Sequence, residues 1–298
     1  MESKSFYSDI VILGHIAKDI IEIDGKSKES LGGAVYYGGI AGSHMGLKVS
    51  IITRLSKEDF SILEVFKKNG IKYFAYPSKQ TSGLRNIYSS HRMESREYQP
   101  LGFAGSFKKE EIPIITTKFF IIAPITSGEV DVELLEYIQK NYNGNLCLDI
   151  QGFIRFRENN KVIYKKLSQD EKDSIFSKVK ILKLDQTEAF ILTNQKSINK
   201  ALKKLISFGP EEILITHEKG ISVNVSDNIY FFPWENRLNI GRTGRGDTAF
   251  VSYVGSRISR NPKDALKFSA ALTSLKLESS GPFSLPLYQV YELEKKFY

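Results

Sequence analysis

The sequence predicts an α/β fold in which helices cover both faces of a mostly parallel central sheet. Short apolar runs alternate with amphipathic segments of helical length along nearly all of the 298 residues. Because parallel strands need helical crossovers and are covered on both faces, this alternation is typical of a three-layer α/β/α domain. No repeat, low-complexity tract or long linker divides the chain, so we expect a single domain over residues 1–298.

Six apolar runs are the strand candidates, and the helix candidates lie between and after them. Strands are expected at 10–13, 49–53, 119–122, 146–150, 181–184 and 213–216. Helices are expected at 33–45, 58–69, 132–141, 170–178, 198–208, 247–259 and 262–277. Ligands of such sheets bind beyond the carboxyl ends of the strands, so the site is expected at that edge.

Two segments do not follow this alternation. Residues 20–31 are typical of a small hairpin with a turn near Asp24 and Gly25, and residues 84–103 alternate polar and apolar side chains as exposed strands do. Both come soon after core strands, so we expect them to pack together as a small β-strand lid over the ligand cleft. A lid excludes water from a reaction that water would otherwise intercept.

Composition and charge favour a cytoplasmic protein with a small anionic ligand. The net charge is +8, but the lysines occur as scattered pairs without a stripe of interleaved aromatic residues, which disfavours nucleic acid as a partner. The single cysteine, Cys147, excludes an internal disulfide and suits a reducing compartment. The chain has neither an apolar run of membrane-spanning length nor the pattern of a signal peptide, so neither a membrane nor export is expected.

Several familiar catalytic patterns are missing from the chain. It contains no P-loop, no His-Glu-x-x-His, no cysteine pair and no Gly-x-Ser-x-Gly, and its four histidines are dispersed. A structural metal site is therefore not expected. Phosphate chemistry without a P-loop remains as the main class.

The most informative stretch begins at Gly241 and continues past Asp247. Three glycines lie within six residues, Asp247 follows directly, and an apolar run of helical character comes next. Glycines let the backbone turn its N–H groups toward one point, and a helix N-terminus adds its dipole, so the stretch suits an anion. A phosphate would repel a carboxylate there unless that carboxylate does chemical work, so Asp247 is a candidate general base. Taken alone, the stretch is better explained as a glycine-rich turn in which Asp247 caps the helix.

A second set of candidates lies near the N-terminus. Asp19 follows the first strand and can accept hydrogen bonds from sugar or polyol hydroxyl groups, while Gly32 and Gly33 let a backbone approach a small ligand closely. In isolation, Asp19 is better explained as a turn residue and the glycine pair as a packing contact.

Taken in order, these residues resemble the ribokinase-like (PfkB) carbohydrate kinases along nearly the whole chain. Members carry Gly-Gly near the N-terminus and Gly-Ala-Gly-Asp near the C-terminus, and the matching residues here are Gly32-Gly33 and Gly244-Arg245-Gly246-Asp247. The resemblance implies that Asp247 is the catalytic base. It also implies that the N–H groups of Arg245, Gly246 and Asp247 form an anion hole, and that Asp19 binds substrate hydroxyls.

Two further motifs match with departures. The family's Asn-x-x-Glu, which helps to place Mg²⁺ and phosphate, corresponds to residues 185–188, where Glu188 matches and Asp185 replaces the asparagine. The nucleotide loop, Thr-x-Gly-x-x-Gly in many members, corresponds to Thr216 to Gly220, with the middle glycine missing and a shorter spacing. The resemblance also implies donor contacts from Lys183, Arg242 and Thr243.

The departures favour the myo-inositol kinase branch. The two arginines at 242 and 245, together with the segment that starts at Asp149, are similar to that branch, which implies substrate contacts from Gln151 and Arg155 beside those from Tyr36 and Arg85. Arg155 is equally well explained as a surface charge beside Glu158. Other acceptors stay open: ribose, fructose, 2-keto-3-deoxygluconate or adenosine, and, as a weaker alternative, a non-catalytic sugar-binding relative.

The resemblance therefore implies transfer of the γ-phosphoryl group of ATP to a hydroxyl of a cyclic polyol. Mg²⁺ would bridge the phosphates, held at Glu188 through water, and Asp247 would accept the hydroxyl proton. Arg245, where most relatives have alanine, is a candidate charge clamp on the transferring group, unless it points to solvent or pairs with Asp185 or Glu188. The lid strands could pair two chains into a homodimer, unless Arg85, Arg92 and Arg96 blunt that edge.

Overall fold

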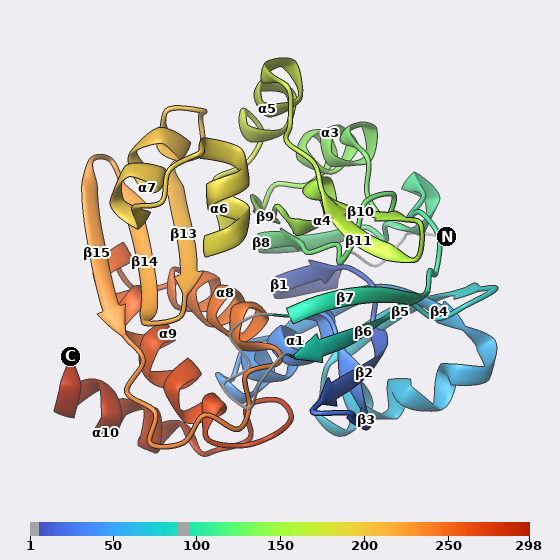
Figure 1. Ribbon diagram of the computed structural model, residues 1–298, viewed down its shortest axis with the longest axis horizontal. Helices are drawn as coiled ribbons and strands as arrows, with labels where there is room; N and C mark the ends of the chain where they lie inside the picture. Colours follow the sequence, from blue (N-terminus) through green and yellow to red (C-terminus); the bar gives the residue numbers. More distant parts are fainter. Residues whose placement is uncertain (1–5, 89–95) are drawn as a thin grey trace.

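A nine-stranded sheet forms the centre of the protein (Figure 1). The structure is a computed structural model that describes residues 6–88 and 96–298. The strand order is β15-β14-β13-β12-β9-β8-β1-β4-β5. The strands are Phe6–Leu13 (β1), Val49–Ser56 (β4), Lys72–Ser78 (β5), Ile115–Ile122 (β8), Asn145–Asp149 (β9), Ile181–Asp185 (β12), Glu212–His217 (β13), Gly220–Val225 (β14) and Asn228–Pro233 (β15). All neighbours from β5 to β13 pair in parallel, and β14 and β15 add an antiparallel edge.

Helices cover both faces of this sheet. One face carries α3 (Val132–Asn141), α5 (Gln169–Phe176), α6 (Gln186–Thr193) and α7 (Ile198–Ile206). The other carries α1 (Ala34–His44), a 3-10 helix at Lys57–Leu63, α2 (Glu64–Lys68), α8 (Arg245–Ser256) and α9 (Pro262–Leu277), and α10 (Leu287–Phe297) packs on α9. Alternate residues of β1 enter opposite cores: Val11 and Leu13 join the first, Ile10 and Ile12 the second. The predicted fold class is confirmed.

A second, four-stranded sheet stands beside the large one, with the order β3-β2-β6-β7. Its strands are Ala17–Ile23 (β2), Lys26–Gly32 (β3), Gly83–Tyr88 (β6) and Arg96–Gly102 (β7), and we call it the small sheet (Figure 1, right). Asp24 and Gly25 join β2 to β3 with φ of 49° and 74°, the left-handed backbone that a two-residue hairpin requires. Because β2 pairs in parallel with β6, the two expected segments form one sheet. Arg92 lies outside the described residues.

A short connection follows β9 and supplies part of the site. It consists of α4 (Gln151–Ile154) and the hairpin of β10 (Arg155–Glu158) with β11 (Lys161–Tyr164), and β11 lies against β7. A 3-10 turn at Lys109–Glu111 precedes β8. The connection after β9 therefore reaches both sheets.

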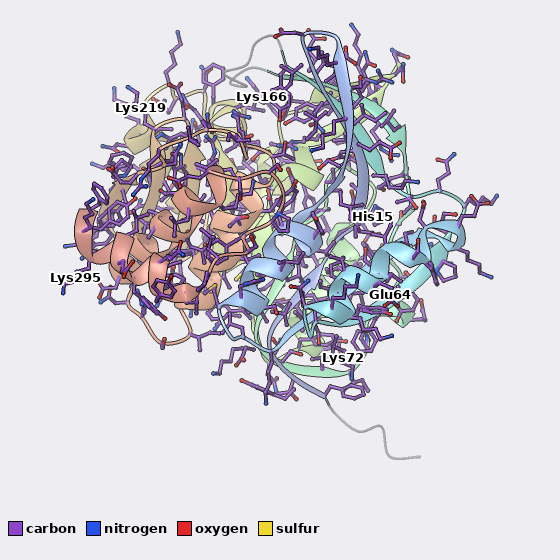
Figure 2. All side chains as sticks on the ribbon, turned by 90° about the horizontal axis from the view of Figure 1, so that it is seen from below. His15, Glu64, Lys72, Lys166, Lys219 and Lys295 are labelled. Carbon is purple, nitrogen blue, oxygen red and sulfur yellow. The ribbon has the colours of Figure 1, made fainter. Side chains whose placement is uncertain are left out.

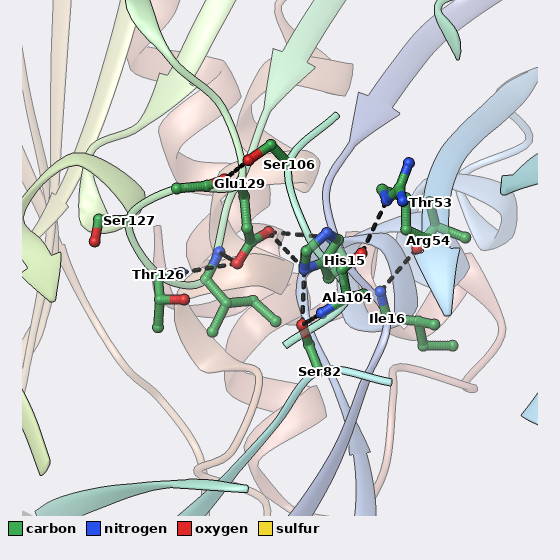
Figure 3. Close-up of polar contacts among 12 residues, drawn as sticks. His15, Ile16, Thr53, Arg54, Ser82, Ala104, Ser106, Thr126, Ser127 and Glu129 are labelled. Carbon is green, nitrogen blue, oxygen red and sulfur yellow. Dashed lines mark hydrogen bonds and ion pairs between the residues drawn. The ribbon is translucent and has the colours of Figure 1, made fainter. Parts of the chain in front are cut away.

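A buried polar cluster ties the two sheets together (Figure 3). Nδ1 of His15, just after β1, lies 2.7 Å from Oγ of Ser82 and 3.3 Å from Oε2 of Glu129. Ser82 precedes β6 and accepts the N–H of Ala104, which follows β7, at 3.0 Å. Segments that enter and leave the small sheet thus meet at one histidine.

The charges of this cluster are strongly affected by burial. Burial, and then the charge of Arg54, lower the pKa of His15 to about 3. Burial raises the pKa of Glu129 to about 7, although the N–H groups of Thr126 and Ile125 donate to its Oε1 at 2.9 and 2.8 Å. His15 is therefore neutral at physiological pH.

The surface shows how the positive charge is distributed. Lys72, Lys166, Lys219 and Lys295 project outward at separate places on the molecule, whereas His15 lies inside it (Figure 2). Among the described residues, no helix has the length and apolar character needed to cross a membrane.

Candidate active site

A cavity lies between the small sheet and the carboxyl ends of the central strands. The small sheet contributes Asp19, Gly32, Leu84, Asn86 and Tyr98. The large sheet and the start of α8 contribute Lys183, Asp185, Thr216 and residues 242–247. Gly33, Tyr37, Ile125, Gln151 and Arg155 complete the lining. Residues far apart in sequence are thus gathered at the edge where an α/β sheet binds its ligands.

The start of α8 supplies the anion-binding backbone of this cavity. Gly244 is the N-cap, with φ of 80° and ψ of 6°, and Asp247 is the third residue of the helix. A Cβ at position 244 would lie 2.2 Å from ring atoms of Tyr37, so both the left-handed backbone and the ring require glycine. The N–H of Thr248 donates to the carbonyl of Gly244 at 2.9 Å. We call residues 241–247 the anion loop, because its helix N-terminus presents backbone N–H groups and a positive dipole end.

A buried ion pair lies next to the anion loop. Nζ of Lys183 lies 2.7 Å from Oδ2 of Asp149, and both side chains are almost fully buried. A Cβ at Gly246 would lie 3.2 Å from Nζ of Lys183, so this ammonium group is directly beside the loop. Burial lowers the pKa of Lys183, but the charges of Asp149, Glu188 and Asp247 outweigh it and hold the pKa above its usual value. Lys183 therefore carries a stable positive charge at the cavity wall.

A second buried pair lies at the end of β12. Nη2 of Arg155 donates to Oε1 of Glu188 at 2.6 Å and lies 3.5 Å from Oδ2 of Asp185. Asp185 caps α6 and forms a reciprocal capping box with Glu188: each carboxylate accepts the other residue's N–H, at 2.8 and 2.6 Å. Burial, and then the charge of Asp185, raise the pKa of Glu188 to about 7 despite Arg155 and Lys183. Arg155 is 4% exposed, so it is not a surface charge, and Glu158 pairs with Lys165.

The opposite wall of the cavity is built around Asp19. Its Oδ1 accepts the N–H of Leu84 at 2.8 Å, which fixes the carboxylate between β2 and β6. Its Oδ2 occupies the space that a Cβ at Gly32 would need, at 2.3 Å. Gly33 is the N-cap of α1 with φ of 90°, and a Cβ there would lie 2.4 Å from the carbonyl oxygen of His15. The glycine pair thus serves both the carboxylate and the helix start.

The first helical residue of α8, Arg245, lies over an aromatic ring. Its guanidinium carbon is 5.8 Å from the centre of the Trp234 ring, and the indole N–H donates to the carbonyl of His217 at 2.9 Å. Burial, and then the charge of Arg245, lower the pKa of His217 to about 4. The hairpin between β13 and β14 turns through only two residues, Glu218 and Lys219. The segment after Thr216 is therefore a tight turn rather than an extended loop.

Most of the residues expected from the sequence line this single cavity. They are Asp19, Gly32, Gly33, Gln151, Arg155, Lys183, Asp185, Thr216, Arg242, Thr243, Gly244, Arg245, Gly246 and Asp247.

Four expected residues do not line it. Tyr36 lies in a neighbouring cavity with Ile21 and Ile240. Arg85 pairs with Glu22 at 3.0 Å on the small sheet. Gly220 is packed against β15, where a Cβ would lie 2.3 Å from the carbonyl oxygen of Phe232.

The fourth, Glu188, lies behind Arg155 with both carboxylate oxygens engaged. Glu188 was expected to contact Mg²⁺ through water. Asp185 is the better candidate for that contact, because it is the carboxylate of this motif that lines the cavity. Among residues 6–88 and 96–298, no group of three or more His, Cys, Asp or Glu side chains could hold a metal ion.

Several residues of the site were missed from the sequence. Tyr37, Leu84, Asn86, Tyr98 and Ile125 line the cavity. Asp149 and Lys276 lie just outside it, in contact with Lys183 and with the anion loop. Asp149 ends a buried strand, which is a usable signal, whereas a lysine on a helix such as Lys276 gives none.

Known structures resemble this chain over almost its full length. No known family model matches it, and no curated protein does. A pyrophosphate-dependent kinase in the ribokinase family, in complex with sulfate, is 30% identical, with a TM-score of 0.87 and coverage of 95% of this chain and 99% of the other. The complex of such a kinase with a pyrophosphate analogue and myo-inositol is also 30% identical, with a TM-score of 0.87 and coverage of 96% and 99%.

A third structure is a pyrophosphate-dependent myo-inositol-1 kinase converted into a myo-inositol-3 kinase. It is 28% identical, with a TM-score of 0.87 and coverage of 97% of this chain and 100% of the other. Fold, site and comparisons together define a phosphotransferase that acts on a hydroxyl group. The chain belongs to the ribokinase family of kinases.

Proposed function

We propose that this kinase transfers a phosphoryl group from pyrophosphate to a hydroxyl group of myo-inositol. The observation that carries the proposal is one cavity in which Asp19 and Asp247 face the same space as Arg155, Lys183, Arg242 and Arg245. The carboxylates suit an acceptor rich in hydroxyl groups, and the cations suit a compact polyanion. The donor and acceptor of the structures at 28–30% identity support both choices.

The acceptor half of the cavity matches a cyclic polyol. Asp19, Asn86 and Gln151 offer polar groups, and Leu84 and Ile125 offer apolar surface for C–H faces. Hydroxyl-rich ligands need several fixed acceptors and donors, because each polar group left unpaired weakens binding. We propose that the small sheet acts as a lid that closes over this acceptor.

The donor half of the cavity favours a small polyanion. Four cationic side chains line the cavity together with the N-terminus of α8, so binding energy comes from charge and backbone N–H groups. Beside the loop, Arg245 lies over Trp234, and the hairpin after Thr216 is tight. A nucleotide draws further affinity from its base and sugar, whereas pyrophosphate needs only the phosphate contacts. ATP, the donor expected from the sequence, is the alternative.

The proposed chemistry uses residues in direct reach of the cavity. Asp247 accepts the proton of the acceptor hydroxyl while the hydroxyl oxygen forms a bond to one phosphorus of pyrophosphate. The bond from that phosphorus to the bridging oxygen breaks, and inorganic phosphate is released. The N–H groups of the anion loop, with Lys183 and Arg245, stabilise the charge on the transferring group. Asp185 lines the donor half and would hold Mg²⁺ through water, where the ion would neutralise phosphate oxygens.

The proposal is tested by a matrix of donors and acceptors. Purified protein with Mg²⁺ is given pyrophosphate or ATP in combination with myo-inositol, ribose, fructose or adenosine, and the phosphorylated product is followed by phosphorus NMR. We expect product from pyrophosphate and myo-inositol, and we expect Asp247→Asn to lower kcat by roughly 10²–10⁴-fold.

Each result has a distinct meaning. If the enzyme turns over with ATP but not with pyrophosphate, the proposed donor is wrong. If it phosphorylates ribose but not myo-inositol, the proposed acceptor is wrong. Near-normal turnover by Asp247→Asn would overturn the assignment of the base.

A further inference from the structure

Lys276 is a buried lysine that the chemistry described above does not use. It lies in the last turn of α9, and the residue is 1% exposed. Its Nζ donates to the carbonyl oxygens of Gly241 and Thr243, which lie three residues and one residue before Gly244. The same Nζ lies 4.9 Å from the centre of the Tyr37 ring.

These contacts hold the anion loop against the C-terminal end of α9. The N–H groups of Ile240 and Gly241 also donate to the carbonyl of Leu277, at 3.0 and 2.8 Å, so the loop is docked on the end of α9. Tyr37 closes the arrangement, because its ring faces Lys276 and occupies the space beside Gly244. The ammonium group of Lys276 thus contacts both the residues before Gly244 and the ring that packs against Gly244.

The partners of Lys276 are those of a bound cation. Carbonyl oxygens and an aromatic face attract a positive charge without neutralising it. Burial lowers the pKa of Lys276 to about 7, while the charge of Asp247 raises it and that of Arg245 lowers it. A buried ammonium group is costly, and the carbonyl contacts offset part of that cost.

We propose that the Lys276 ammonium is a built-in cation that orders the anion loop, so that the enzyme needs no free monovalent cation. Carbonyl oxygens that converge on one point would otherwise repel one another, and the loop would lose the conformation in which its N–H groups face the donor. Lys276 is a positioning residue, since it acts through Gly241 and Thr243. The inference rests on the proposed role of the anion loop in phosphoryl transfer.

The first experiment needs no variant. The wild-type enzyme is assayed near pH 6, where the ammonium form predominates, with tetramethylammonium as the sole monovalent cation and then with added K⁺ or NH₄⁺. We expect activity that changes less than about twofold on the additions. A requirement of the wild type for K⁺ or NH₄⁺ would overturn the proposal.

The second experiment removes the ammonium group. Lys276→Ala leaves a space lined by the two carbonyls, and we expect kcat to fall about 10²-fold, a loss typical of disturbing one set of oxyanion donors, with recovery of at least tenfold in K⁺ or NH₄⁺. Lys276→Met fills the space without charge, so no recovery is expected. The matched control is Lys263→Ala at the exposed start of α9, which should behave as wild type.

A readout independent of turnover separates this proposal from the proposed function. Trp234 is the single tryptophan of the chain and lies beside Arg245 of the anion loop. We expect its fluorescence in Lys276→Ala to differ from wild type and to return with K⁺ or NH₄⁺, whichever donor the enzyme uses. A folded Lys276→Ala protein with wild-type kcat and fluorescence would overturn the proposal, as would a loss that neither ion restores.

Discussion

The guanidinium group of Arg155 donates to Oε1 of Glu188 at 2.6 Å, and neither side chain is more than 5% exposed. Arg155 lines the cavity, whereas Glu188 lies behind it and also accepts the N–H of Asp185. The ring centres of Tyr98 and Tyr164 lie 5.2 and 5.8 Å from the guanidinium carbon. Glu188 therefore influences the cavity through the position of Arg155.

Replacement of Arg155 by Met should destabilise the fold. Loss of the cation leaves the buried Glu188 carboxylate beside the like charge of Asp185, and we expect the free energy of unfolding at pH 8, where Glu188 is ionised, to fall by about 3 kcal/mol. The measurement is urea denaturation. Lys165→Met is the control, because its pair with Glu158 is about half exposed and its loss should cost less than about 1 kcal/mol. Equal losses in the two variants would contradict the structural role of Arg155.

Gly244→Ala tests the contact between the anion loop and Tyr37. Gly281 offers a matched control, because its φ is 88° against 80° at Gly244, while a Cβ at 281 would meet nothing within 4 Å. Alanine in the left-handed region costs about 1–2 kcal/mol at either position. At 244 we expect about 1–3 kcal/mol more, since the methyl group overlaps the ring. Thermal unfolding of both variants measures the difference, and identical melting temperatures would contradict it.

Arg245→Ala tests the charge clamp. If the guanidinium contacts the transferring group, its removal should lower kcat about 10²-fold, as the loss of one oxyanion donor does. The Michaelis constant for the acceptor should change little, because the acceptor half of the cavity is untouched. Arg237→Ala, at an exposed position before the anion loop, is the control. An unchanged kcat would remove Arg245 from the proposed mechanism.

The cluster around His15 predicts a pH dependence of stability with two opposing parts. The pKa of Glu129 rises from 4.5 in the unfolded chain to about 7, so the folded protein binds more protons and the free energy of unfolding falls as pH rises through this window. The pKa of His15 falls from 6.5 to about 3, so its contribution is lost as pH falls through that window.

Glu129→Gln removes the first part and leaves the second. Relative to wild type, the variant should therefore gain about 3 kcal/mol of stability between pH 4.5 and pH 7, from about 1.4 kcal/mol per unit of pKa. Urea denaturation at the two pH values measures this change. Parallel stability curves for the two proteins would show that Glu129 ionises in the folded state as it does in the unfolded chain.

The central part of the fold could be predicted from the sequence, and the edges could not. The six expected strands are β1, β4, β8, β9, β12 and β13, whose residues are mostly buried and therefore form continuous apolar runs. The strands β5, β14 and β15 lie at or near the edges, where polar residues alternate and where Pro77 interrupts the pattern. Helix α6 was missed because its capping box, Asp185 with Glu188, was interpreted only as a ligand motif.

The site could be predicted where the backbone itself is the functional element. Glycines at 32, 33, 244 and 246 mark close approaches that the structure contains. Side-chain direction was harder: Tyr36 was expected in the cavity, but Tyr37 lines it. Each residue of a helix turns by about 100°, so the choice depends on the exact start of α1. The partners of Arg155 and Lys276 come from distant segments, which no local pattern reveals.

The cavity is lined by residues of two separate sheets, and this bears on how the enzyme can evolve. Asp19, Leu84, Asn86 and Tyr98 belong to two hairpins outside the large sheet, while Asp247 and the cations belong to the large sheet and its connections. Substitutions in the hairpins can therefore alter the shape of the proposed acceptor half without disturbing the packed strands of the proposed donor half. An ancestor with this layout could explore new alcohols while it kept one phosphoryl donor, and directed evolution of acceptor choice should start in these hairpins.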